Sequence, residues 1–326
     1  MQFFMKLSLG VAALLVLVLS GALLLLRRDD VPYAALEAKY AKVESEFVNL
    51  SGGVRAHYRD QGRADGRTLV LIHGFGVSLE TWEPWVRHLA DRYRLVSIDL
   101  PGHGLTRAPE NYAPSIRGFA DFVNDFAVAK GLENYTLIGN SMGGHTAWVL
   151  ALRHPQRLDA LVLIDAGGWP NLPPPQQRPL AFRLLANPRI APLLATLDPK
   201  PVMQNGLRAA FANKALATDA LASRYADMAS APGHRQILGA IGARRGRTDI
   251  DATLQRLAAI AIPTLILWGE MDELIPVAHA QKFKDAIKGS RAIIYPGIGH
   301  LPYEELAEKT AMDLGNFLDA SDVSTE

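Results

Sequence analysis

Apolar residues along the chain gather in short, nearly uninterrupted runs, each followed by a turn and then by a segment with helical spacing. The expected buried strands are Thr68 to Ile72, Arg94 to Leu100, Tyr135 to Gly139, Leu158 to Ala166, Pro263 to Gly269 and Ala292 to Pro296. The expected helices are Thr81 to Ala90, Ile116 to Lys130, Met142 to His154 and Val277 to Ile287. This alternation predicts an α/β fold with a mostly parallel, doubly wound sheet.

The segment before this alternation has a different pattern. Good helix formers and alternating charges from about Pro32 to Phe47 predict a juxtamembrane helix, assigned to residues 29–48. From Phe47 to Asp60 the pattern predicts two short strands joined by a Ser-Gly-Gly turn.

A second stretch, residues 167–250, has no buried-strand run and contains proline clusters and alanine-rich pieces. It predicts a helical lid or cap inserted between a first core part, residues 49–166, and a second, residues 251–326. Residues 167–248 hold 11 Lys and Arg against 3 Asp, a local charge of +8. These cations could face anionic lipid or simply be solvated on helix surfaces, and the sequence favours neither.

The first 28 residues predict a transmembrane anchor. From Leu7 to Leu26 no residue is charged, and a helix of that length spans roughly 30 Å, the thickness of a bilayer core. A cleaved signal peptide is the alternative, but the run is long for one and ends in Arg27, Arg28 and two aspartates without a small-residue cleavage site. More Lys and Arg follow the run than precede it, so the positive-inside rule by itself would keep the globular part in the cytoplasm.

Composition excludes some functions and leaves others open. With 49% hydrophobic and 21% charged residues, the chain is typical of a globular protein. The net charge of +1 gives no indication of a nucleic-acid partner. The absence of cysteine excludes disulfides, thiolate metal sites and a cysteine nucleophile.

The stretch Gly139-Asn140-Ser141-Met142-Gly143 fits G-x-S-x-G and lies between a predicted strand and a predicted helix. This is the setting of a nucleophile elbow, in which a tight turn exposes the serine hydroxyl at the positive end of a helix. Ser141 is therefore the candidate nucleophile.

A serine hydroxyl needs a base to remove its proton, and the base needs an acid to orient it. His300 follows the last apolar strand, and Asp272 follows the strand before it. Both should lie at the carboxyl edge of the sheet, where open α/β sheets place their sites. Glu270 and Asp165 are rival acids.

Together with HGFG at His73 to Gly76, DLPGHG at Asp99 to Gly104 and the final GIGH, these motifs resemble the α/β-hydrolase family. The resemblance covers nearly all of residues 50–320. It implies that the backbone N–H groups of Phe75 and Met142 form an oxyanion hole and that the insertion covers the site. It implies no metal and no organic cofactor.

Other polar and aromatic residues have plainer interpretations. His73, His103 and His145 are expected to be structural, and Asp99 should support the glycine loop that follows it. Trp169 is a candidate substrate-binding residue in the acyl pocket, with packing in the core as the equal alternative.

The predicted function is a membrane-anchored serine hydrolase that cleaves acyl esters of lipids, of the lipase or phospholipase type. The resemblance to bacterial lipases with an anchor implies a single-pass inner-membrane protein with a periplasmic catalytic domain, against the charge count. A carbon–carbon bond hydrolase, a small-ester esterase and a catalytically silent binding protein are the alternatives. The anchor and juxtamembrane helix are a candidate homodimer contact.

Overall fold

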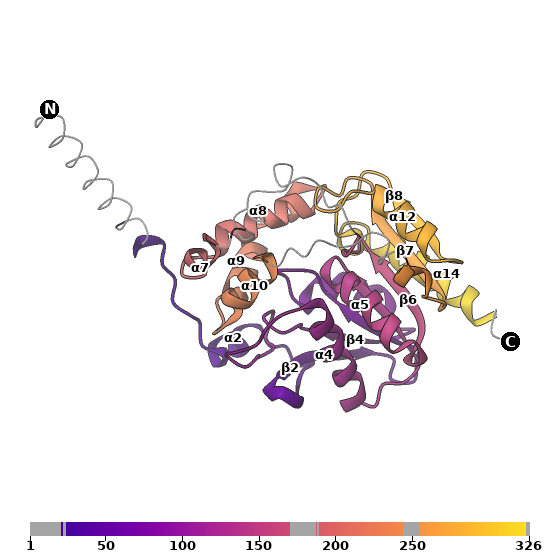
Figure 1. Ribbon diagram of the computed structural model, residues 1–326, viewed down its shortest axis with the longest axis horizontal. Helices are drawn as coiled ribbons and strands as arrows, with labels where there is room; N and C mark the ends of the chain where they lie inside the picture. Colours follow the sequence, from indigo (N-terminus) through magenta and orange to yellow (C-terminus); the bar gives the residue numbers. More distant parts are fainter. Residues whose placement is uncertain (1–20, 22–23, 170–186, 188, 244–254, 324–326) are drawn as a thin grey trace, which may run out of the picture.

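The computed structural model describes residues 21, 24–169, 187, 189–243 and 255–323. Its centre (Figure 1) is a sheet of eight strands in the order β1-β2-β4-β3-β5-β6-β7-β8, in which β2 runs antiparallel to both of its neighbours and all the other pairs are parallel. The strands are β1 (Ser45–Asn49), β2 (Arg55–Gly62), β3 (Thr68–Ile72), β4 (Arg94–Ile98), β5 (Tyr135–Asn140), β6 (Leu158–Ile164), β7 (Thr264–Gly269) and β8 (Arg291–Tyr295). The predicted parallel α/β sheet is confirmed, and its six predicted strands lie where expected.

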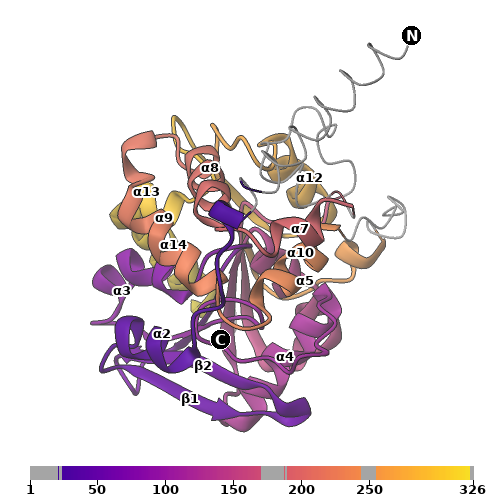
Figure 2. The ribbon, with the colours of Figure 1, turned by 90° about the vertical axis from the view of Figure 1, so that its left-hand side faces the viewer.

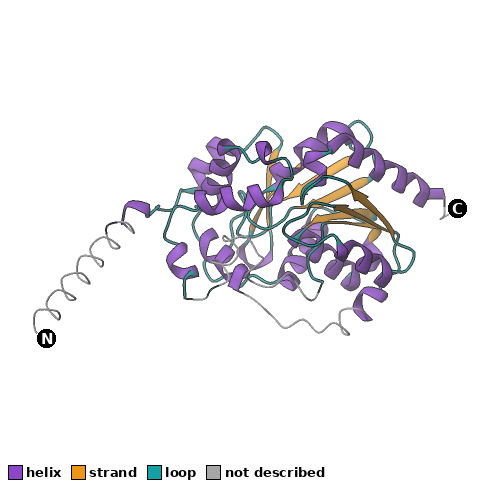
Figure 3. Cartoon of the chain, turned by 90° about the horizontal axis from the view of Figure 1, so that it is seen from above, coloured by secondary structure: helices purple, strands orange, loops and turns teal. Residues whose placement is uncertain are grey.

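Helices cover both faces of the sheet (Figure 3). The flanking helices are α3 (Glu83–Leu89), α4 (Ile116–Ala129), α5 (Met142–Arg153), α12 (Ala278–Ala286), α13 (Pro302–Glu305) and α14 (Ala307–Val323). Alternate residues of a strand point to opposite faces, so Val70 packs in the core beneath α4 and α5, whereas Leu71 packs in the core beneath α3 and α14. Burial on both faces explains why the parallel strands have continuous apolar runs.

The insertion between β6 and β7 forms a helical cap over one end of the sheet (Figure 2). Its described helices are α7 (Ala191–Leu194), α8 (Lys200–Ala210), η5 (Lys214–Leu216), α9 (Asp219–Ala229) and α10 (His234–Ala243). The backbone N–H of His300, in the loop after β8, donates to the carbonyl of Ala210 at the end of α8 (2.7 Å). The cap therefore lies against the carboxyl edge of the sheet.

Several cations of the cap form ion pairs within the molecule. Lys200 pairs with Asp219, Lys214 with Glu273, Arg224 with Glu80 and Arg235 with Asp30, at 2.6–3.3 Å. These pairs account for part of the excess positive charge, so those four cations are already engaged by acidic side chains.

The predicted juxtamembrane helix is shorter than expected. Helix α2 spans Tyr33–Tyr40, and the end of the assigned helical segment, Ser45 to Val48, lies in β1 (Ser45–Asn49), where the sequence also predicts a strand from Phe47. Antiparallel pairing with β2 overrides the local helix propensity there, and Phe47 packs against His57 with ring centroids 5.0 Å apart.

Before α2, the chain is bound to the cap by main-chain hydrogen bonds. The N–H of Arg28 donates to the carbonyl of Thr196 (3.1 Å), and the N–H of Asp198 donates to the carbonyl of Leu26 (2.9 Å). We call residues 26–31 the N-terminal arm.

Most of the predicted anchor, residues 1–28, lies outside the described residues. Among the residues that are described, no helix has the length and apolarity that crossing a membrane requires.

Candidate active site

Ser141 occupies a sharp turn between β5 and α5. Its backbone has φ 56° and ψ −115°, a conformation that is costly for a residue other than glycine. A Cβ atom on Gly139 would lie 2.3 Å from the carbonyl oxygen of Gly143, and one on Gly143 would lie 2.3 Å from that of Ile72. Only glycine fits at these two positions, as the G-x-S-x-G pattern predicts for a nucleophile elbow.

Backbone hydrogen bonds hold the elbow against the neighbouring strand. The N–H of Ser141 donates to the carbonyl of Ile164 (3.0 Å), and its carbonyl accepts from the N–H groups of His145 (3.0 Å) and Gly167 (2.8 Å). Ser141 is thus the N-cap residue of α5, where backbone N–H groups favour negative charge.

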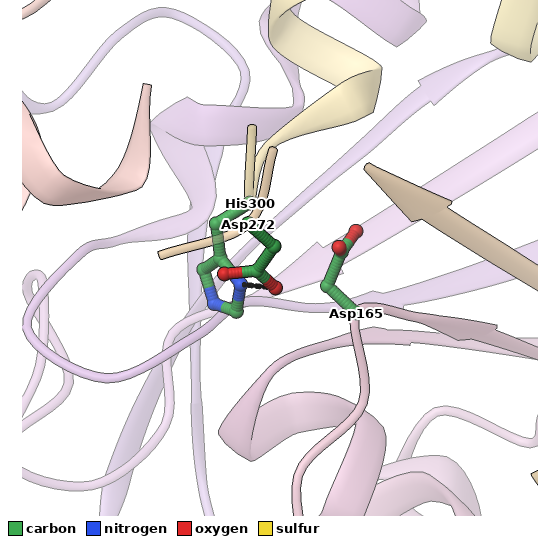
Figure 4. Close-up of side chains that lie close together, drawn as sticks. All are labelled: Asp165, Asp272 and His300. Carbon is green, nitrogen blue, oxygen red and sulfur yellow. Dashed lines mark hydrogen bonds and ion pairs between the residues drawn. The ribbon is translucent and has the colours of Figure 1, made fainter. Parts of the chain in front are cut away.

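His300 and Asp272 form a buried acid–base pair. Nδ1 of His300 lies 2.7 Å from Oδ2 of Asp272, and their side chains are 4% and 0% exposed (Figure 4). Oδ1 of Asp272 accepts from the N–H groups of Leu274 (2.7 Å) and Ile275 (2.9 Å). A carboxylate with these donors favours its charged form and fixes the proton of His300 on Nδ1.

The two rival acids lie elsewhere. Glu270 is exposed and accepts from the N–H of Gly297 at 3.1 Å. Asp165 is fully buried at the end of β6, and its Oδ1 accepts from the N–H of Gly269 at 3.0 Å. Of the three candidates, Asp272 is the carboxylate that contacts His300.

Two side chains that the sequence analysis missed hold the base in place. The amide of Asn140 donates to the carbonyls of Ile164 (3.2 Å) and His300 (3.1 Å), so it joins the elbow to the loop of the base. Glu305 accepts from the N–H groups of Gly299 (2.8 Å), Ala212 (3.1 Å) and Asn213 (2.9 Å), so it joins that loop to the cap. The position of Asn140 next to Ser141 in the sequence was a signal for its contact with the loop of His300. No local pattern indicated the contacts of Glu305.

The loop after β3, which carries the predicted oxyanion residue Phe75, runs beside the elbow. A Cβ atom on Gly74 would lie 3.2 Å from Cβ of Ser141. Met142, the second predicted oxyanion residue, is the first residue of α5. The structure therefore brings these two backbone segments to the same place. The cap lies over them, because a Cβ on Gly76 would be 3.6 Å from the sulfur of Met203 in α8.

The structural histidines and Asp99 support these loops. His73 is buried, with Nδ1 2.7 Å from the carbonyl of Gly74, while its Nε2 accepts from the N–H of Leu100 at 3.0 Å. Asp99 accepts from the N–H groups of Leu79 (2.8 Å) and Leu105 (2.9 Å) and lies 2.6 Å from Nδ1 of His57. Asp99 thus braces the glycine loop, as the sequence indicates.

Trp169, the candidate substrate-binding residue, is 8% exposed and packs in the core. Its ring lies edge-on to Phe283 of α12, with centroids 5.3 Å apart. These contacts favour packing in the core over substrate binding as the role of Trp169.

One group of three potential metal ligands occurs within the part of the chain that the structure describes. One carboxylate oxygen each of Asp165 and Asp272 and one ring nitrogen of His300 lie within 4.8 Å of one another. Because Nδ1 of His300 already faces Asp272, this group has the geometry of an acid–base cluster.

Comparisons with known proteins agree with this architecture. Residues 67–306 match the family model described as alpha/beta hydrolase fold. A solved structure of a membrane phospholipase A, described as a bacterial virulence factor, is 28% identical with a TM-score of 0.71, covering 97% of this chain and 99% of that one. A 2-hydroxy-6-oxononadienedioate/2-hydroxy-6-oxononatrienedioate hydrolase of Paraburkholderia xenovorans is 30% identical, covering 84% of this chain and 95% of its own length.

A lipase is also among the relatives. Lipase 3 of Moraxella sp. is 25% identical, with 87% of each chain covered. The family match extends over most of the sheet, the elbow and the loop of His300, and the chain therefore belongs to the α/β-hydrolase fold family.

Proposed function

We propose that this protein is a membrane-anchored serine ester hydrolase acting on acyl lipids. The observation that carries the proposal is the buried contact of 2.7 Å between His300 and Asp272 at the sheet edge where Ser141 occupies a strained elbow. A turn serine with a purely structural role would need neither the strain nor an acid–base pair beside it.

The proposed mechanism uses Ser141 as nucleophile. Nε2 of His300 removes the hydroxyl proton while Oγ attacks the ester carbonyl, and Asp272 stabilises the imidazolium that forms. The backbone N–H groups of Phe75 and Met142 stabilise the oxyanion of the tetrahedral intermediate. His300 then protonates the leaving alcohol. In the second half of the reaction, His300 removes a proton from water as the water attacks the acyl-enzyme, and it returns that proton to Oγ of Ser141 as the acid leaves.

A lipid substrate is supported by the relatives and by the sequence before the arm. Similar proteins include a membrane phospholipase A and a lipase. The uncharged run from Leu7 to Leu26 would keep the catalytic domain at a bilayer, where such esters are concentrated. Ion pairs engage Lys200 and Lys214 of the cap and leave fewer cations for lipid headgroups, so the anchor is the stronger argument.

The nucleophile is tested by labelling with a fluorophosphonate probe. We expect covalent labelling of the wild-type protein, and none of a Ser141→Ala variant that keeps the wild-type circular dichroism spectrum. An unlabelled wild-type protein would indicate a catalytically silent binding protein. Labelling that survives in Ser141→Ala would place the nucleophile elsewhere.

A carbon–carbon bond hydrolase is the second candidate, and the relative from Paraburkholderia xenovorans favours it. Phospholipid, triglyceride, a short-chain nitrophenyl ester and a ring-fission dienoate should be assayed side by side. The lipid proposal expects the largest kcat/KM with phospholipid or triglyceride, and a preference for the dienoate would overturn it.

We further propose a single-pass protein of a bacterial inner membrane with a periplasmic catalytic domain. A reporter that is active only in the periplasm, fused after Glu326, should be active, and activity of a cytoplasmic reporter would reverse the orientation. The anchor and α2 are proposed as a homodimer contact. Full-length protein in detergent should then be dimeric, while a chain starting at Ala41, which lacks the anchor and α2 but keeps β1, should be monomeric.

A further inference from the structure

Asp165 lies beside the acid–base pair but has no part in the mechanism above. It directly follows β6, is fully buried, and has a positive φ of 44°, so the surrounding structure holds it in an unfavourable backbone conformation. Oδ1 accepts from the N–H of Gly269 (3.0 Å). Oδ2 is buried and receives no N–H or O–H from the described residues. One carboxylate oxygen of Asp165, one of Asp272 and a ring nitrogen of His300 lie within 4.8 Å of one another (Figure 4).

Two carboxylates so close together in a buried site cannot both be ionised, so one of them keeps a proton. Asp272 receives two backbone N–H groups and faces Nδ1 of His300, which together stabilise its charged form. Asp165 receives a single backbone N–H. The proton therefore belongs on Asp165.

We infer that Asp165 is a protonated carboxylic acid whose O–H donates to Asp272 and thereby positions the acid of the catalytic pair. This inference rests on the proposed function, because positioning is measured through catalysis. Without this proton, the carboxylate oxygens of Asp165 and Asp272 would face each other as two acceptors. The O–H of Asp165 instead gives Asp272 a hydrogen-bond donor that holds its carboxylate toward His300 without adding charge.

The electrostatic surroundings agree with a neutral Asp165. Burial raises the pKa of Asp165 well above its ordinary value, and the negative charges of Asp272 and Glu305 raise it further. The titratable groups that face it come from the loops after β7 and β8, from the end of β8 and from α13: Asp272, His300, Tyr295, Tyr303 and Glu305.

The test compares two replacements that are both uncharged. Asp165→Leu removes the donor and should lower kcat about 10-fold or more with KM changed less than about twofold. Asp165→Asn keeps an N–H donor of similar shape and should recover most of the activity that Leu loses. The acidic limb of its kcat/KM profile should lie within about 0.3 pH units of the wild type, since no charge is lost. Asp159→Asn, on the same strand and away from the site, is the matched control.

An ionised Asp165 would give a different result. Asp165→Asn would then remove a negative charge near His300 and lower the pKa of the acidic limb by about one unit or more, which overturns the inference. Equal activities of the Leu and Asn variants would overturn the positioning role. Infrared difference spectra supply a second readout that needs no turnover: at neutral pH the wild-type minus Asp165→Asn spectrum should contain a protonated carboxylic acid band, because the buried Glu304, whose pKa is raised to about 7, contributes to both proteins and cancels. Failure of the wild type to react with the fluorophosphonate would instead count against the proposed function.

Discussion

Asn140 donates its side-chain amide to the backbone carbonyl of His300 at 3.1 Å, so the residue before the proposed nucleophile holds the loop that carries the proposed base. Tyr303 supports Asn140 from the other side, because its hydroxyl donates to Oδ1 at 3.4 Å. The relative placement of the proposed nucleophile and base therefore depends on a side chain outside the proposed catalytic trio.

Replacing Asn140 with leucine should separate positioning from substrate binding. The change keeps a similar size but leaves the buried carbonyls of Ile164 and His300 without this donor. We expect kcat to fall about 10–100-fold with KM changed less than about twofold. The free energy of unfolding should fall by about 1–3 kcal/mol. Steady-state kinetics and urea unfolding measure the two effects, with Asn49→Leu on the exposed side of β1 as control. An unchanged kcat would show that the contact does not position the base.

Replacing Asp272 with asparagine should lower kcat by about 10⁴-fold, because an amide cannot stabilise the imidazolium and favours the wrong tautomer of His300. Glu270→Gln is the matched control, two positions away on the same loop and exposed. It should keep wild-type kcat. The reverse ranking of the two variants in an esterase assay would assign the acid to Glu270.

The parallel strands and the flanking helices could be predicted because burial on both faces leaves a local signature in the sequence, as in β3 from Thr68 to Ile72. The candidate nucleophile, base and acid could be predicted because strand ends bring Ser141, Asp272 and His300 to one edge. The first residues of β1, Ser45 and Glu46, could not, since their conformation comes from pairing with β2. The hydrogen bonds of Asn140 and Glu305 join residues far apart in the chain, and local sequence patterns do not indicate such hydrogen bonds.

The steric requirement at Gly143 predicts a large loss of stability on substitution by alanine. The added Cβ would lie 2.3 Å and 2.5 Å from the backbone carbonyl oxygens of Ile72 and His73, which cannot move without displacing β3. We expect the free energy of unfolding to fall by about 3 kcal/mol or more, measured by urea unfolding. Gly206→Ala in α8 is the control, because nothing lies within 4 Å of its added Cβ. That variant should be about 0.5–1 kcal/mol more stable than the wild type.

Acid should destabilise the protein partly through His145. Burial, together with the nearby charge of Arg256, lowers the pKa of His145 to about 4, and its ring stacks on Trp148 with centroids 4.8 Å apart. A histidine with a lowered native pKa stays neutral in the folded state while the unfolded chain takes up a proton. Stability is therefore lost as the pH falls from about 6.5 towards 4.

The measurement is the change in the free energy of unfolding between pH 7 and pH 5. His145→Phe keeps an aromatic ring over Trp148 and removes the titration, so its loss of stability should be about 2 kcal/mol smaller than that of the wild type. His88→Phe, on the exposed side of α3, should lose as much as the wild type. Equal losses for His145→Phe and the wild type would show that the pKa of His145 is the same in the folded and unfolded states.

The contacts of the N-terminal arm predict that Arg28 fixes the position of the cap. Nη1 of Arg28 lies 2.9 Å from Asp198, its other terminal nitrogen donates to Asp227, and its carbonyl accepts from Arg235 at 2.7 Å. In an Arg28→Met variant, Asp227 would still accept a hydrogen bond from Lys39 (2.7 Å). The free energy of unfolding should therefore fall by only about 1 kcal/mol. We expect amide hydrogen exchange at residues 196–198 to accelerate about fivefold, while exchange in β5 stays unchanged.

Arg27→Met is the matched control, because Arg27 is exposed and pairs with the exposed Asp29 at 3.5 Å. Equal exchange in the two variants would show that the main-chain hydrogen bonds of the arm hold the cap without the Arg28 side chain.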